Sequence, residues 1–76
     1  SSLAAVSNGK NPTIYFHIHT LYIPQEFLSE YHLLDTSGRI AIDWQLGKNQ
    51  QDLSKLTPGT YFLIGPHYRR TWVKTN

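Results

Sequence analysis

Apolar and polar side chains alternate with a period of two along this 76-residue chain, and no segment shows a convincing helical repeat. The pattern is clearest at 13–19, where Ile14, Phe16 and Ile18 would face one way, and it returns at 39–46. Such alternation is typical of a sheet with one face packed and the other in water. The chain is therefore expected to form antiparallel β structure.

The other expected strands are shorter or less regular. In the second alternating segment the residues expected to face inward are Ile40, Ile42, Trp44 and Leu46. Segments rich in β-branched and aromatic residues predict three more strands, at 30–35, 60–64 and 68–74. A weak strand is expected at 3–6 and a short edge strand at 51–54. The segment 23–28 is expected to be a loop that plugs the end of the sandwich with Phe27 and Leu28, rather than one turn of helix.

Turn-forming residues separate these segments at close spacing, beginning with Asn8-Gly9. At 35–39 a tight hairpin is expected, in which Asp35 accepts backbone N–H groups and Gly38 supplies a positive φ. Thr57-Pro58-Gly59 is expected to be a type II turn, with glycine at the third position. Short strands with a turn about every 8–12 residues predict a small all-β sandwich.

Size and composition exclude several classes of protein. The chain is long enough for one small domain with a compact core. With 39% hydrophobic and 16% charged residues it is too apolar for a disordered tail. No run approaches the roughly 18 apolar residues of a membrane span, and the absence of cysteine excludes disulfides, thiolate zinc sites and cysteine nucleophiles. Because the chain begins at Ser1 without methionine, it is interpreted as a piece of a longer protein.

No pattern in the sequence predicts catalysis, a metal or a cofactor. His17 and His19 have the one metal-like spacing, but a third ligand would have to come from residues that the sequence does not fix: His32, His67 or Asp43. There is no Gly-x-Ser-x-Gly nucleophile elbow. Of the five carboxylates, Asp35 and Asp52 are expected to serve in turns. The chain is therefore expected not to be an enzyme.

The second half of the chain carries an ordered set of motifs. The hairpin ending in Gly38-Arg39 is followed by Asp52-Leu53-Ser54-Lys55-Leu56, then by Pro58-Gly59-Thr60-Tyr61, and finally by a basic strand ending in Trp72-Val73-Lys74. This combination resembles the C-terminal sorting domain (type A) of cargo of the type IX secretion system of Gram-negative bacteria. The resemblance covers about residues 30–76, and in the first half only Asn11-Pro12 is similar to the family pattern. The residues that match the family motif are Asp35, Gly38, Arg39, Asp52, Leu53, Gly59 and Tyr61.

The resemblance implies an immunoglobulin-like sandwich of about seven strands, with residues 1–76 acting as a single, non-catalytic sorting and docking domain. Such a domain directs its parent through the periplasm and across the outer membrane, to the cell surface or the medium. The implied partners are the outer-membrane shuttle and translocon proteins. In most cargo a surface sortase removes the domain and attaches anionic lipopolysaccharide, whereas some components of the machinery retain it. A monomer or weak dimer is expected.

The basic strand at 68–74 is the expected docking surface, because the family places its recognition determinants at this end. Alternation puts Tyr68, Arg70, Trp72 and Lys74 on one face, and Arg69, Thr71 and Val73 on the other. The residues expected to contact the translocon are Tyr68, Arg69, Arg70, Trp72 and Lys74. The strand would add to a partner's sheet or bind an acidic patch.

Three other interpretations of this strand stay open. In the first, Trp72 or Val73 belongs to the core and the cations form a solvated rim. In the second, the domain is a carbohydrate-binding or adhesin-like module that stacks sugars on Tyr15, Tyr68 and Trp72. In the third it binds single-stranded nucleic acid, which the formal net charge of only +2 disfavours.

Overall fold

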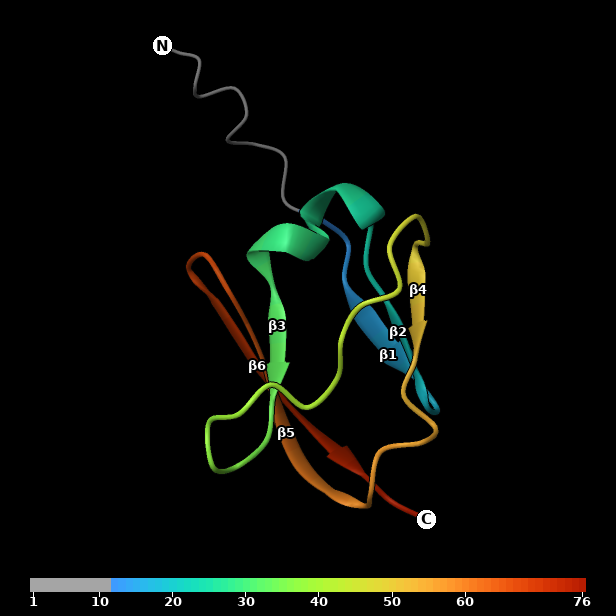
Figure 1. Ribbon diagram of the computed structural model, residues 1–76, viewed down its shortest axis with the longest axis vertical. Coiled ribbons are helices and arrows are strands. Elements are labelled where there is room, and N and C mark those ends of the chain that lie inside the picture. Colours follow the sequence, from blue (N-terminus) through green and yellow to red (C-terminus); the bar gives the residue numbers. More distant parts are fainter. Residues whose placement is uncertain (1–11) are drawn as a thin grey trace, which may run out of the picture.

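The computed structural model describes residues 12–76, which form two antiparallel three-stranded sheets and one short 3-10 helix (Figure 1). The strands of the first sheet, in spatial order, are β1 (Tyr15–His17), β2 (Thr20–Tyr22) and β4 (Gln50–Asp52). Those of the second are β3 (His32–Leu34), β5 (Gly59–Gly65) and β6 (Tyr68–Lys74). The prediction of a small all-β sandwich is confirmed, with six strands in the described part of the chain.

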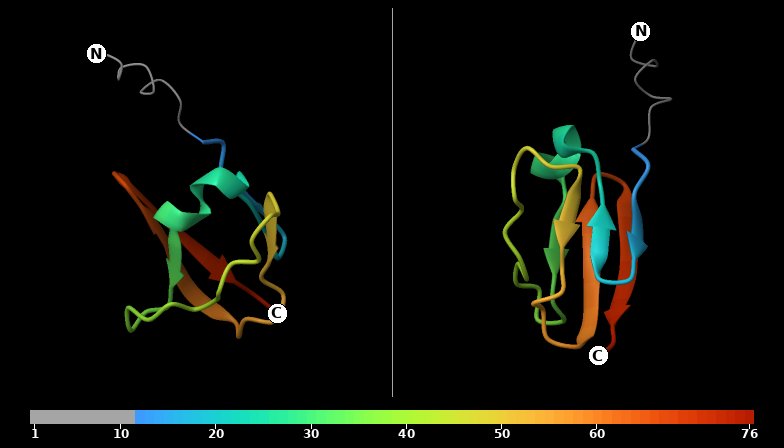
Figure 2. Two further views of the ribbon diagram at one scale, coloured as in Figure 1. Left: turned by 45° about the horizontal axis from the view of Figure 1, so that its top comes forward. Right: turned by 90° about the vertical axis from the view of Figure 1, so that its right-hand side faces the viewer.

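The core lies between the two sheets and is closed at one end by the short helix (Figure 2). Its buried members come from both sheets, the helix and the loops that join them: Leu21, Ile23, Leu28, Tyr31, Leu33, Leu53, Tyr61 and Leu63. Each fully buried leucine or isoleucine contributes about 2 kcal/mol relative to an exposed one. The β3-β5-β6 sheet supplies more of these residues than the other sheet, with Leu33, Tyr61 and Leu63 against Leu21.

The helix η1 (Gln25–Glu30) occupies most of the segment expected to be a loop, so that expectation was wrong. Pro24 immediately precedes it and accepts a hydrogen bond from the Phe27 N–H at 3.0 Å, which is the closing bond of a tight helical turn. Leu28 is buried and Phe27 packs against the core, as predicted for the plug. In the described part of the chain no helix has the length and apolarity needed to span a bilayer.

The strand expected at 13–19 is interrupted by a turn. β1 ends at His17, Ile18 and His19 form the turn, and β2 returns with His17 opposite Thr20. Ile18, expected to face inward, has a φ of +56° and is 74% exposed. The sequence contains no glycine or asparagine here to signal the turn, so the pairing of β1 with β2 has overridden the local preference of isoleucine for a strand.

The segment 39–46 is an extended connector rather than a strand. It pairs only at Ile40, which bridges Leu34, before it crosses from the edge of one sheet to the edge of the other. Ile42 and Trp44 pack against the core as predicted, but Ile40 and Leu46 are 57% and 81% exposed. The inward placement of those two was therefore wrong, because a chain that crosses between sheets keeps no constant face.

The remaining expectations are largely confirmed. β3 and β4 lie within the predicted segments or one residue away, β5 extends the predicted strand by one residue at each end, and β6 has the predicted bounds. The strand expected at 3–6 and the turn at Asn8-Gly9 lie outside the described residues.

Candidate docking surface

The five residues expected to form the docking surface lie on two faces of β6. The register places Trp72 opposite Tyr61 and Arg70 opposite Leu63, so both share the core side of the sheet. Tyr68 and Lys74 belong to the same side. Arg69 lies on the outer side. β6 therefore presents no single surface made of all five.

The aromatic residues of β6 pack toward the core. The Trp72 ring stacks on Phe16 of β1, with ring centroids 5.1 Å apart and planes 8° apart, and is tilted against Tyr61 at 5.8 Å. Tyr68 meets Tyr31 edge to face at 5.5 Å. Both rings of β6 are half-buried. Their first role is thus to join the sheets and the core, with aromatic contacts of about 0.5–1.5 kcal/mol each beyond their area burial.

The three cations of β6 differ in exposure. Lys74 is buried, at 6% exposure, whereas Arg69 and Arg70 are exposed. The Arg70 guanidinium lies 5.5 Å from the centroid of the Phe16 ring, and that of Arg69 lies 5.3 Å from the centroid of Phe62 on the opposite face. Both guanidinium groups lie within the roughly 6 Å of a ring centroid at which cation–π attraction acts, and both side chains are exposed.

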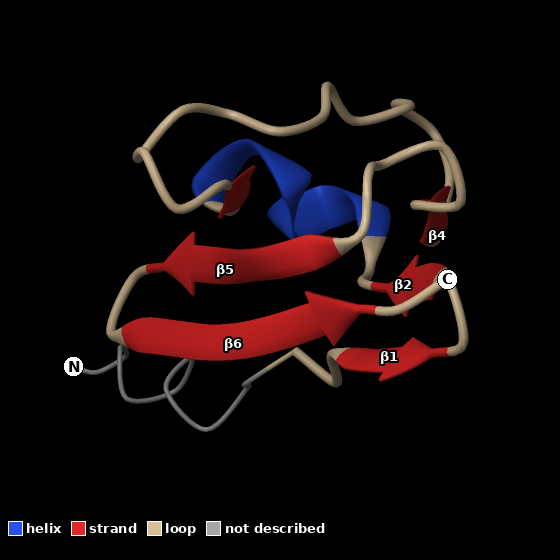
Figure 3. Ribbon diagram, turned by 90° about the horizontal axis from the view of Figure 1, so that it is seen from below, coloured by secondary structure: helices blue, strands red, loops and turns tan. Residues whose placement is uncertain are grey.

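On one side of the sandwich, the connector forms hydrogen bonds to the edge strands β3 and β4. At the edge of β3, the Ala41 N–H donates to the Leu33 carbonyl at 2.8 Å. At the edge of β4, the Gln51 side chain bonds to the backbone of Gln45. On the opposite side, β1 and β6 lie next to each other, and within residues 12–76 each has one strand partner only (Figure 3). Among the described residues, β6 is thus a seven-residue edge strand with one unpaired side.

The hairpin expected from the family motif has the predicted geometry. Oδ1 of Asp35 accepts hydrogen bonds from the Ser37 N–H at 2.8 Å, the Ser37 hydroxyl at 2.6 Å and the Arg39 N–H at 3.1 Å. Gly38 has a φ of +86°. The Ser37 hydroxyl and the backbone N–H of Arg39 stabilise the carboxylate and lower the pKa of Asp35 below its ordinary value. These residues build a turn.

The other motif residues also hold the fold. Asp52 accepts a hydrogen bond from the Ser54 N–H at 2.9 Å, which lowers the pKa of its carboxyl. Leu53 is fully buried. The Tyr61 hydroxyl donates to the Thr57 carbonyl at 2.6 Å and so ties β5 to the loop that precedes it. Gly59 has a positive φ, but at +152° it does not have the value near +80° of the expected type II turn.

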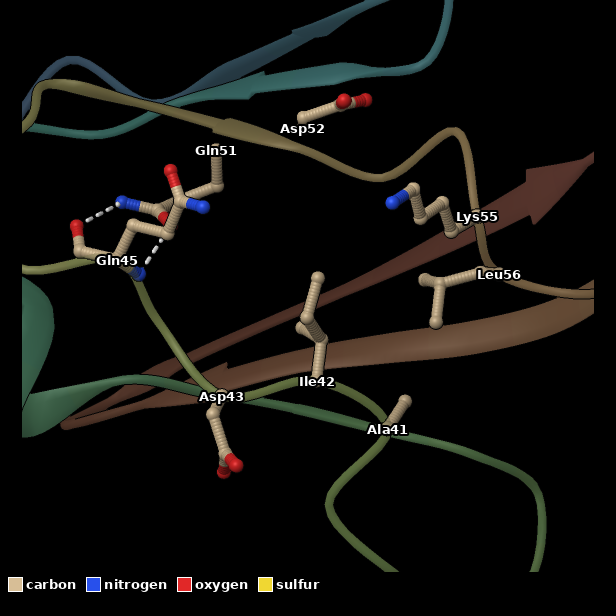
Figure 4. Close-up of a pocket in the computed structure, with 8 residues that line it drawn as sticks. All are labelled: Ala41, Ile42, Asp43, Gln45, Gln51, Asp52, Lys55 and Leu56. Carbon is tan, nitrogen blue, oxygen red and sulfur yellow. Dashed lines mark hydrogen bonds between the residues drawn. The ribbon is translucent and has the colours of Figure 1, made fainter.

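A hollow lies between the connector and β4 (Figure 4). It measures about 430 Å³, and its lining includes Ile42, Leu56, Asp52 and Lys55. Asp52 and Lys55 lie on the β4 side of the hollow, and the side chain of Asp43, on the connector, turns away from it.

The histidine spacing singled out in the sequence does not lead to a ligand cluster. His17 ends β1 and His19 lies in the following turn. Within residues 12–76 no group of three or more His, Asp or Glu side chains has the geometry to hold a metal ion. No protein-family model, no curated protein and no solved structure matches this chain.

Proposed function

We propose that this chain is a non-catalytic sorting and docking domain of the type IX secretion class, with an immunoglobulin-like fold. In this role it would be recognised in the periplasm and would dock its parent to outer-membrane shuttle and translocon proteins at the cell surface. The observation that carries the proposal is β6, a seven-residue edge strand whose second side is unpaired within the described residues and which carries Arg69 and Arg70. The motif hairpin at Asp35–Arg39 supports it, because its geometry matches the turn that the resemblance requires.

Recognition through β6 would combine two kinds of contact. An extended segment of the partner can pair with the free backbone groups of the strand, as in other cases of strand addition. Arg69 on one side and Arg70 on the other can then each bind a carboxylate. All five acidic residues of the chain lie between Glu26 and Asp52, so the charged side chains of β6 are all positive. The proposed partner segment is therefore acidic.

A sugar-binding role has less support. Its three proposed stacking residues do not share a surface, because Tyr15 lies on the outer face of β1, stacked on Tyr22 at 4.6 Å, whereas Trp72 packs inward on Phe16. Tyr68 is occupied by Tyr31. Tyr15 alone, at 47% exposure, offers a ring to a ligand.

A secretion assay tests the proposal. Residues 1–76 would be fused to a periplasmic reporter in a host with a type IX system, and surface delivery would be compared for the parent sequence, Arg69→Glu, Arg70→Glu and the control Lys48→Glu. Lys48 is an exposed cation in a loop outside β6. We expect surface delivery for the parent and the control, and reporter retained in the periplasm for both arginine variants. A fusion that stays in the periplasm in every form, or delivery equal in all four, contradicts the proposal.

A further inference from the structure

The outer face of the β3-β5-β6 sheet is apolar. The register aligns Ile40, Leu34 and Phe62 in one row across the sheet, and Ile64 and Val73 lie on the same face. These five residues are called the outer apolar face. Ile40 and Val73 are 57% and 58% exposed, and the other three are partly exposed. The other sheet and η1 both pack on the opposite, inner side (Figure 2), so no described element covers this face.

The sequence of β5 has the pattern of a strand that is covered on both sides. Tyr61, Phe62, Leu63 and Ile64 form an uninterrupted apolar run. Tyr61 and Leu63 enter the core, whereas Phe62 and Ile64 point to the outer face. A strand with one face in water alternates apolar with polar residues, and a continuous apolar run is typical of burial on both faces. Contiguous apolar surface of this kind marks interaction sites.

Arg69 places a positive charge on the outer apolar face. Arg69 lies on it, with its guanidinium 5.3 Å from the Phe62 centroid, and the register places His32 on the other side of Ile64. The strands β3, β5 and β6 contain no aspartate or glutamate. If two copies of this face packed against each other, Arg69 of one copy would repel Arg69 of the other. The complementary partner surface is therefore one that carries carboxylates.

The dimensions of the face fit one helix. Three strands about 4.8 Å apart give a width close to the diameter of about 10 Å of an α-helix with its side chains. Along β5 the face extends from Ile64 to Thr60, about 13 Å, or between two and three helical turns. We propose that the outer apolar face docks one amphipathic helix of a partner protein, with acidic residues beside its apolar stripe. This surface is separate from the free edge of β6, and the inference does not depend on the secretion role.

Two synthetic peptides of about 18 residues test the proposal. They share one leucine stripe at helical spacing, and the remaining positions are glutamate-rich in one and lysine-rich in the other. Binding to the 76-residue chain would be followed by nuclear magnetic resonance titration. We expect the glutamate peptide to shift the resonances of Leu34, Ile64 and Val73, and the lysine peptide to bind at least about tenfold more weakly.

Substitutions on the chain complete the test. In the double variant Ile40→Thr, Val73→Thr, threonine keeps the β-branched shape but removes apolar contact, so the affinity for the glutamate peptide should fall about tenfold. The control Leu46→Thr changes an exposed apolar residue off this face and should bind unchanged. Absence of binding, equal affinity for both peptides, shifts confined to other residues, or self-association that the double variant abolishes would each overturn the proposal.

Discussion

The side chain of Gln51 pairs with the backbone of Gln45 as a neighbouring strand would. Its Oε1 accepts the Gln45 N–H at 2.7 Å and its Nε2 donates to the Gln45 carbonyl at 2.9 Å. Gln51 is 1% exposed, and these bonds are partly buried because Gln45 itself lies at the surface. One buried amide thus ties the connector to β4 without any extension of the sheet.

This relationship predicts the effect of Gln51→Leu. Leucine has a similar size but no polar atoms, so the N–H and carbonyl of Gln45 lose their partners. The free energy of unfolding should fall by about 1–3 kcal/mol. Urea denaturation measures it, with Gln50→Leu as the control because Gln50 is the exposed neighbour on the same strand. Equal effects of the two substitutions would contradict the structural role of Gln51.

The Asp35 turn predicts a dependence of stability on pH. Because its hydrogen bonds lower the folded-state pKa of Asp35 below the ordinary 3.8, the stabilisation is fully present above that value and is lost as pH falls through the folded pKa. Asp35→Ala should therefore lower the melting temperature at neutral pH, and the difference from the parent should shrink as the pH falls below 3.8. Asp43→Ala, at an exposed position in the connector, is the control. A difference that stays constant with pH would contradict this assignment.

Much of the fold could be predicted because its signals are local. The Asp35–Arg39 hairpin depends on one acceptor side chain and one glycine, and both act within five residues. β5 and β6 are long enough for their composition to define them. The connector could not be predicted, because it is held by a buried glutamine side chain, Gln51, and by a single bridge to Leu34, and neither contact leaves a periodic pattern in the sequence.

The candidate site was predicted less completely than the fold. The alternation of β6 correctly separates Trp72 from Val73, but it does not tell which of the two faces the core. Trp72 faces the core because its ring stacks on that of Phe16, which is far away in the sequence. The outer apolar face was missed, although the apolar run at 61–64 was a usable signal for it.

The turn between β1 and β2 predicts a stabilising substitution. Ile18 is β-branched, has a φ of +56° and is mostly exposed, so it bears backbone strain and gains little from burial. Ile18→Gly should raise the free energy of unfolding by about 1 kcal/mol. Ile40→Gly removes another exposed isoleucine where no positive φ occurs, and it should destabilise instead. Thermal unfolding of both variants measures the contrast, and the same sign for the two would rule out strain at Ile18.

Because Trp72 and Val73 lie on opposite faces of β6, substitutions at these adjacent residues should change the free energy of unfolding by very different amounts. Trp72→Ala removes the ring that stacks on Phe16 and contacts Tyr61, so it should lower the free energy of unfolding by about 2–3 kcal/mol. Val73→Thr changes an exposed side chain and should stay within about 0.5 kcal/mol of the parent. Urea denaturation compares them, and similar effects would contradict the inward position of Trp72. Since loss of Trp72 weakens the fold itself, a secretion defect in Trp72→Ala, or on deletion of the end of β6, does not identify a docking contact. Arg69 and Arg70 are exposed, so a secretion defect caused by substituting either of them would identify a docking contact.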